Sequence, residues 1–487
     1  MVETEATRSG LRGVTRPGLL IAGLSLVVLT VAVLQTAVVP VLGIIAQQLN
    51  VSTVAASWAV TANLLAAAAA TPLIGRLADL HSKKHVLLTV LVIVLAGSVL
   101  AAVTTSLPLL VLARVLQAAS YGLYPVAIAI LREELPEDRM GSAMSVLSGT
   151  LGFGGGTGLV VVGLLMSGHA GYHRVFWLTT AFTVVVIAIA VLLVPIRPRS
   201  ATGTIDWVGA AGLAAGLSAV LLAITQGHSW GWTSPATLTC AACGVMILVA
   251  WWFWERRAKQ PLVSTEMMTR RPIMLTNLAT VFVGMGLYFA FLGLTQFVQI
   301  PGGAAGYGFG ATVLEASVVY LLPGALTGFL VALASGRFID RFGARPVLAV
   351  AAVAGIVGFL FVALVHDAPW QVIVASILAN AYISLGYGAL PALVVAEVDA
   401  GETGVATSMN AIARTVGSSM AAALVAVLLG RTMAGAPMES SFVAIFVSGA
   451  ATATLAMVLI ALSRPRATAN DSVEAQYESR AMNHEWG

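Results

Sequence analysis

The chain has 487 residues, of which 59% are hydrophobic and 9% are charged, and its mean hydropathy is +0.94. Soluble proteins contain about 45–50% apolar and about 25% charged residues, so this composition excludes an ordinary soluble enzyme or binding module. The formal net charge of +4 comes from basic residues that are dispersed between apolar stretches, which argues against a nucleic-acid partner.

Apolar stretches long enough to form membrane helices recur along the whole chain. A bilayer core about 30 Å thick requires about 20 apolar residues per helix. After a polar N-terminal tail (residues 1–18), this criterion predicts fourteen spans, at residues 19–46, 54–75, 85–105, 108–131, 141–167, 174–196, 207–226, 236–254, 274–300, 312–335, 345–365, 370–396, 404–430 and 441–463. Because lipid offers no partner to backbone N–H and C=O groups, these spans must be helical, which predicts an all-α polytopic membrane protein.

The distribution of Lys and Arg predicts the orientation of the spans. An even number of spans places both termini on one side, and the segments on that side hold 21 of the 25 Lys and Arg residues. The opposite side holds Arg174 and Arg431, while Arg114 and Arg414 fall within spans. By the positive-inside rule we expect both termini in the cytoplasm and the chain in the plasma (inner) membrane.

Three short motifs occur twice, in the same order, in the two halves of the chain. The pairs are Gly75–Asp79 with Gly336–Asp340, Gly122–Pro125 with Gly388–Pro391, and Gly141–Ser145 with Gly404–Ser408. This internal repeat predicts two six-helix bundles, at residues 19–196 and 274–463. The residues between them, 197–273, are expected to form an inserted helix pair, and residues 464–487 a cytoplasmic disordered tail.

At these motifs the sequence resembles the major facilitator superfamily, and specifically its fourteen-helix drug:proton antiporter branch. The segments GRLADLHSKK and GRFIDRFGAR resemble a loop that forms a cytoplasmic gate in this family. The resemblance implies the gate residues Gly75, Asp79, Lys83, Lys84, Gly336, Asp340, Arg341 and Arg345. A carboxylate near a helix end can pair with a cation or a helix N-terminus in one conformation and lose that partner in another. The alternative is a solvated loop that only sets topology.

The fourth span contains RVLQAASYG, which resembles the family pattern RxxQGxG at Arg114 and Gln117. A charge within a membrane helix costs at least about 2.5 kcal/mol, so Arg114 requires a polar cavity or a partner. Arg114 is therefore a functional candidate, and the alternative is a structural cation satisfied by backbone carbonyls. The fifth span keeps Gly158 but has Leu159 in place of the family's antiport proline.

The spans contain neutral polar and cationic side chains but no evident acid, since Leu34 stands where many relatives carry a carboxylate. We expect a substrate cavity lined by Gln35, Thr36, Asn63, Arg114, Gln117, Tyr121, Tyr124, Gln296, Asn380, Tyr387, Asn410 and Arg414. This set favours a neutral, amphipathic or anionic substrate. Glu315 and Asp340 are the candidates for proton coupling, which requires a group whose pKa changes between the two access states. The alternative for Glu315 is an exposed acid at a helix start.

Together these features predict a secondary active transporter that exports small amphipathic molecules by proton antiport with alternating access. The alternative is an importer or uniporter of a small metabolite or lipid-like compound, because fold does not determine direction. The seven His residues are scattered and the two Cys, Cys240 and Cys243, have no ligand cluster beside them, so we expect no enzyme, metal or cofactor. The expected partners are the substrate, protons and the lipid bilayer, and we expect a monomer.

Overall fold

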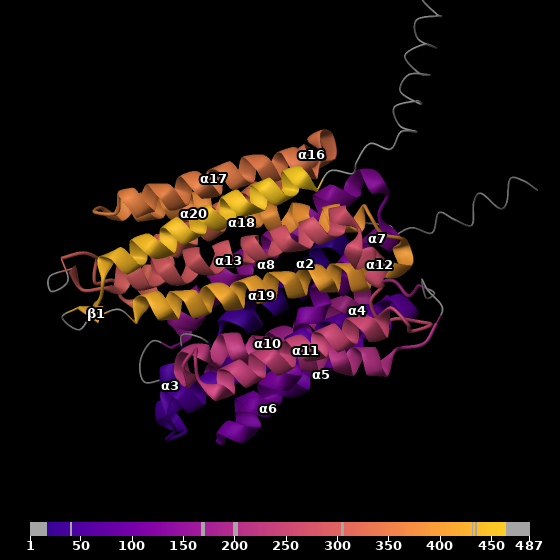
Figure 1. Ribbon diagram of the computed structural model, residues 1–487, viewed down its shortest axis with the longest axis horizontal. Helices are drawn as coiled ribbons and strands as arrows, with labels where there is room; N and C mark the ends of the chain where they lie inside the picture. The colour runs from indigo at the N-terminus through magenta and orange to yellow at the C-terminus, as the bar shows by residue number, and fades with distance from the viewer. Residues whose placement is uncertain are drawn as a thin grey trace, which may run out of the picture.

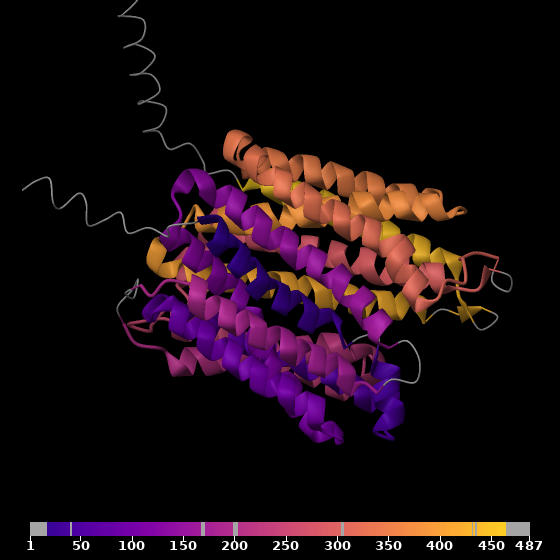
Figure 2. The same cartoon turned by 180° about the vertical axis from the view of Figure 1, so that it is seen from behind.

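The computed structural model describes residues 17–38, 41–166, 171–197, 203–302, 306–430, 432–433 and 436–463. Within these residues, fourteen helices are long and apolar enough to cross a membrane, which confirms the predicted all-α membrane fold. The long helices run roughly side by side, along the horizontal direction of Figures 1 and 2. The predicted C-terminal tail and most of the N-terminal tail lie outside the described residues.

The elements follow one another in the order of the predicted spans. Those of the first six spans are α2 (Pro17–Thr36), α3 (Leu42–Gln48), α4 (Thr53–Leu80), α5 (Lys83–Val103), α6 (Leu107–Gln117), η2 (Ala118–Gly122), α7 (Leu123–Glu134), α8 (Glu137–Leu165) and α9 (His173–Leu193). They are followed by α10 (Trp207–Trp230), α11 (Pro235–Glu255) and the short α12 (Thr265–Thr269). Those of the last six spans are α13 (Arg271–Gln299), α15 (Val313–Glu315), η3 (Ala316–Leu321), α16 (Leu322–Phe342), α17 (Ala344–Leu364), α18 (Pro369–Val395), η4 (Ala400–Glu402), α19 (Thr403–Leu429) and α20 (Glu439–Leu462). The two-residue strands β1 (Thr432–Met433) and β2 (Ala436–Pro437) pair before α20.

Three predicted spans are not continuous α-helices. The first is divided into α2, which ends at Thr36, and the short α3. The fourth changes to a 3₁₀ turn at Ala118–Gly122, because Pro125 has no N–H to donate to the carbonyl four residues earlier. The tenth starts with the short α15 and continues in a π-helical turn at Ala316–Leu321, which ends two residues before Pro323. Such irregular turns are frequent at functional sites.

Two interfaces join the first six spans to the last six. In one, α8 packs against α16 and α18, and in the other, α19 packs against α4 and α7. The pair α10 and α11 lies beside the second interface, where Leu213 and Leu221 of α10 and Trp251 of α11 share an apolar cluster with Ala68 of α4 and Met409 of α19. The exact division into residues 19–196, 197–273 and 274–463 stays a prediction.

The turn between α16 and α17 is tight because Gly343 adopts a φ of +83°, a backbone conformation that residues other than glycine rarely adopt. It allows α17 to begin directly after α16 ends. Asp340 and Arg345 are thereby held at the same end of the bundle as the start of α2 and the end of α20. We call this end the terminal face.

Candidate functional site

The carboxylate of Asp79, near the end of α4, joins the two groups of six spans at the terminal face. Its two oxygens accept hydrogen bonds of 3.0 Å from the backbone N–H groups of Gly404 and Val405, at the start of α19. The first N–H groups of a helix have no partner within the helix and carry a partial positive charge. Asp79 is fully buried, so the contact joins a buried carboxylate directly to a helix N-terminus.

Glycine at position 75 allows the two helices to come this close. A Cβ atom on Gly75 would lie 2.5 Å from the carbonyl oxygen of Gly404 and 2.2 Å from the Ser408 hydroxyl. Any larger residue would therefore push α4 and α19 apart.

A second contact across the terminal face joins α16 to α8. Asp340 accepts a hydrogen bond of 2.6 Å from the hydroxyl of Ser142. A Cβ atom on Gly336 would lie 2.3 Å from the Cα of Ser142. Asp340 is exposed, in contrast to Asp79.

The repeated motifs thus meet crosswise. The segment Gly75–Asp79 docks on Gly404–Ser408, and its counterpart Gly336–Asp340 docks on Gly141–Ser145. Each half of the chain supplies one carboxylate and one segment that contacts the carboxylate of the other half. Both contacts join the two groups of spans at the terminal face.

The cations predicted for the gate pair with their own group of spans instead. Lys83 forms an ion pair with Glu133, and Lys84 donates to the backbone carbonyl of Val191 at 2.7 Å. Arg341 lies over the ring of the adjacent Phe342 at 5.3 Å, and Arg345 donates to the backbone carbonyl of Ser463 at 3.4 Å. These four cations therefore do not bridge the two groups through the contacts described.

Arg132 of α7 is a further connection that the sequence did not single out. Its guanidinium donates to the backbone carbonyl of Val398 at 2.7 Å and to the hydroxyl of Thr403 at 2.5 Å. In the sequence Arg132 is one of many basic residues near helix ends, so no local pattern distinguishes it.

Deeper in the bundle, a polar layer joins α7, α8 and α18. The hydroxyl of Tyr124 lies 2.8 Å from that of Ser148 and donates to the backbone carbonyl of Tyr387 at 3.2 Å. Ser148 donates to the same carbonyl at 2.8 Å.

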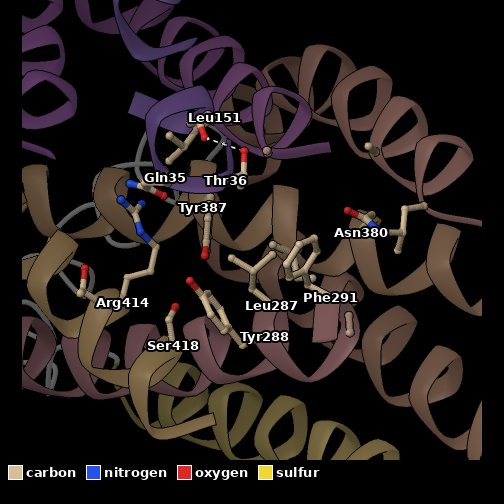
Figure 3. Close-up of a pocket in the computed structure, with 18 of the residues that line it drawn as sticks. Gln35, Thr36, Leu151, Leu287, Tyr288, Phe291, Asn380, Tyr387, Arg414 and Ser418 are labelled. Carbon is tan, nitrogen blue, oxygen red and sulfur yellow. Dashed lines mark hydrogen bonds between the residues drawn. The ribbon is translucent and has the colours of Figure 1, made fainter. Parts of the chain in front are cut away.

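A cavity of about 120 Å³ lies between the two groups of spans. Six of the predicted cavity residues contribute to its lining, namely Gln35, Thr36, Tyr121, Asn380, Tyr387 and Arg414. Figure 3 shows that the labelled side chains come from several helices on different sides of this space. Pockets for drug-sized ligands measure about 300–1,000 Å³, so the cavity must widen to hold a molecule of that size.

The other predicted cavity residues lie elsewhere. Asn63, Arg114, Gln117, Tyr124 and Asn410 are buried in contacts between helices, and Gln296 is exposed. Asn410, for example, donates to the side-chain oxygens of Asn277 and Thr280 at 2.9 and 2.8 Å. A polar residue in an apolar helix thus often fastens neighbouring helices rather than facing the cavity.

Arg114 is held entirely by neutral oxygens. It donates to the carbonyls of Ala59 and Leu34 at 3.0 and 3.3 Å, and to the side-chain oxygen of Gln117 at 2.6 Å. Asn63 in turn donates to the carbonyl of Arg114 at 2.8 Å. This geometry corresponds to the alternative of a structural cation.

The sequence missed several lining residues, among them Leu287, Tyr288 and Phe291 of α13 and Ser418 of α19. Their helices are apolar on nearly all sides, so periodicity does not reveal which face lines a cavity.

Glu315, one of the two acids predicted for proton coupling, lies outside the cavity lining. Its carboxylate is exposed and accepts hydrogen bonds from the backbone N–H and hydroxyl of Thr312 at 2.8 and 3.0 Å. The backbone hydrogen bond lowers the pKa of this carboxyl below its ordinary value. Its role in coupling stays a prediction.

Comparison with known proteins identifies the family. The model of the Major Facilitator Superfamily matches residues 24–207, 205–422 and 309–482. The chain belongs to the major facilitator superfamily. Members of this superfamily are transporters, so the superfamily that the repeated motifs resemble is the one to which the chain belongs.

Several curated members of the superfamily are similar to the chain. The tetracenomycin C resistance and export protein of Streptomyces glaucescens is 28% identical over 86% of the chain and 77% of its own length. The uridine/deoxyuridine transporter of Lactococcus lactis is 28% identical over 65% of the chain and 67% of its own length. An uncharacterized transporter of Mycobacterium tuberculosis is 29% identical over 81% of the chain, but the match spans only 57% of that protein.

Among solved structures, the human organic anion transporter MFSD10 has a similar fold. It matches 91% of the chain and 98% of its own chain with a TM-score of 0.63 and 15% sequence identity. This similarity supports the major facilitator fold and, at this identity, the fold alone.

Proposed function

We propose that this member of the major facilitator superfamily exports small amphipathic molecules across the plasma membrane by alternating access, coupled to proton antiport. The observation that carries the proposal is the crosswise pair of contacts at the terminal face, through Asp79 and Asp340, beside a cavity between the two groups of spans. Alternating access requires that such contacts break when the cavity opens toward that face.

We further propose that the terminal face is cytoplasmic. The segments on this side hold 21 of the 25 Lys and Arg residues, as the positive-inside rule expects. With this orientation, the described conformation is closed toward the cytoplasm.

Proton coupling is proposed to act through the contacts of the terminal face. Asp340 and Asp79 each accept hydrogen bonds across the interface, and a protonated carboxyl would be a weaker acceptor. Protonation would therefore favour opening toward the cytoplasm. Of the two acids predicted from the sequence, Asp340 has this direct connection to the interface, and Glu315 bonds only within its own turn.

We favour export over import because a relative named as an export protein matches a larger share of this chain than a relative named as a nucleoside transporter. The export protein of Streptomyces glaucescens matches more of this chain than the uridine/deoxyuridine transporter of Lactococcus lactis does. Because of the similarity to the uridine/deoxyuridine transporter, transport of a small metabolite is the second candidate function.

The test is transport by the full chain in proteoliposomes with an imposed pH gradient and a chemically diverse panel of amphipathic compounds. The proposal expects movement of substrate against the proton flux and its collapse when the gradient is dissipated. Asp340→Asn should weaken the dependence on the gradient, whereas Asp367→Asn, a matched change of an exposed acid, should not. Flux that runs with the protons would identify an importer, and flux that ignores the gradient would identify a uniporter.

A further inference from the structure

The two arginines within the membrane spans, Arg114 and Arg414, have very different surroundings. All three nitrogens of the Arg114 guanidinium donate hydrogen bonds to protein oxygens. Arg414 of α19 is only 8% exposed, yet within the described residues its guanidinium makes no hydrogen bond and no ion pair. A buried charge without compensation is costly, so the vacant donors of Arg414 require an explanation.

Two aromatic rings hold Arg414 without using its donors. The guanidinium carbon lies 4.7 Å from the ring centre of Tyr387 and 5.3 Å from that of Tyr124. Cation–π contacts of this kind stabilise the charge through the ring faces. They fix the position of the guanidinium and leave its N–H groups unbonded.

A second donor beside Arg414 is also unpaired. The hydroxyl of Tyr387 is buried and has no hydrogen-bond partner in the described structure. Figure 3 shows the side chains of Arg414, Tyr387, Tyr288 and Ser418 around the same part of the cavity. Since Arg414 and Tyr387 both line the cavity, we treat their unpaired donors as parts of one site in that cavity.

The lining of this cavity favours negative charge. Among the lining residues that the structure describes there is no Asp or Glu, and Arg414 is the one side chain with a permanent charge. A cation surrounded by low-dielectric protein attracts an anion more strongly than it would in water. Leu287, Phe291 and Leu294 supply an apolar wall in the same cavity.

We propose that this cavity recognises amphipathic organic anions, whose carboxylate is bound by the Arg414 guanidinium with the Tyr387 hydroxyl as an additional donor. The planar guanidinium matches a carboxylate with two parallel N–H bonds. The apolar body of the anion packs against the wall formed by α13. This inference rests on the proposed transport function and narrows its substrate class.

The experiment compares three probes with the same apolar body: 1-naphthaleneacetate, its neutral amide, and 1-naphthylmethylamine as the cation. Binding to the full chain in nanodiscs is measured by isothermal titration. We expect the carboxylate to bind at least about tenfold more tightly than the amide or the amine. Arg414→Gln should remove this preference, and Arg414→Lys should keep part of it because the charge remains while the two-pronged geometry is lost.

Arg174→Gln is the matched control, since it removes the same charge from an exposed position outside the cavity and should keep the preference. Equal binding of the three probes to the unaltered protein, or no binding of the carboxylate, would overturn the inference without requiring a folded variant. The two proposals fail separately: a preference for anions without gradient-dependent flux would contradict proton antiport alone. Gradient-dependent flux of neutral or cationic compounds only would contradict the anion site alone.

Discussion

Replacement of Asp79 by Asn tests how strongly the terminal face is locked. The amide keeps one oxygen acceptor, but its NH₂ group then faces a backbone N–H of α19, so one of the two charge-assisted hydrogen bonds is lost. A hydrogen bond to a charged group contributes about 1.5–3 kcal/mol. Since 1.4 kcal/mol is a factor of ten, Asp79→Asn should raise the open-to-closed ratio at this face by about 10- to 150-fold.

The opening can be measured by the reactivity of a buried cysteine. Ser145 is a suitable position because it is fully buried, its hydroxyl makes no hydrogen bond, and it lies about 12 Å along α8 from the helix start at the terminal face. Ser145→Cys is placed in a chain whose Cys240 and Cys243 are replaced by Ala. The rate of modification by a membrane-impermeant thiol reagent then reports the open population.

Asp340→Asn gives the internal comparison. Asp340 is exposed and accepts one hydrogen bond from a side-chain hydroxyl, so its replacement should raise the rate by a smaller factor than Asp79→Asn. The reasoning is refuted if Asp79→Asn leaves the rate within about twofold of the parent, a change well below that expected from one charge-assisted bond. A larger effect at Asp340 would equally contradict it.

Three further changes test other parts of the structure. Gly336→Ala should increase the reactivity of the cysteine at position 145, because its Cβ would lie 2.3 Å from the Cα of Ser142 and push α16 away from α8. Gly18→Ala is the control, since a Cβ there meets nothing within 4 Å, and it should have no effect. Equal rates in the two variants would contradict this packing argument. Arg114→Met leaves a buried amide oxygen without its donor, which costs about 1–3 kcal/mol, so Tm in detergent should fall while the binding of anionic probes persists. An unchanged Tm would show that Arg114 is not a structural cation. Glu315→Gln should leave the pH profile of transport near neutrality unchanged, because the lowered pKa means that this carboxylate loses its charge only as the pH falls below the ordinary range of Glu; a displaced profile would instead support coupling at this residue.

The fourteen helices and the internal repeat could be predicted because both are local features of the sequence. Long apolar stretches define the spans, and matching motifs identify equivalent positions such as Gly75 and Gly336. However, knowing that two positions are equivalent in the repeat does not reveal which residues contact each other. That the segment ending at Asp79 docks on the segment beginning at Gly404 depends on how α4 and α19 meet, and no spacing in the sequence encodes this directly.

The candidate cavity was predictable only in part for a related reason. Arg114 and Arg414 are both single cations within apolar helices, and the one partner that lies near Arg114 in the sequence, Gln117, supplies only part of its hydrogen bonding. The separation of their roles arises from distant residues: the carbonyls of Leu34 and Ala59 accept hydrogen bonds from Arg114, whereas Arg414, within the described residues, contacts the rings of Tyr387 and Tyr124 and makes no hydrogen bond. Similarly, Tyr288 lines the cavity because of the rotation of α13 in the bundle, which an evenly apolar helix does not specify.

The contact of Asp79 has an unusual genetic consequence. Its partners at Gly404 and Val405 contribute backbone N–H groups, which no side-chain substitution other than proline removes. Gly404 is further constrained by space, since a Cβ there would lie 2.7 Å from an Asp79 oxygen. Asp79 is therefore the one partner that contributes a side chain to these two hydrogen bonds. Second-site revertants of Asp79→Asn should accumulate away from the start of α19, at positions that strengthen the interface of α16 with α8.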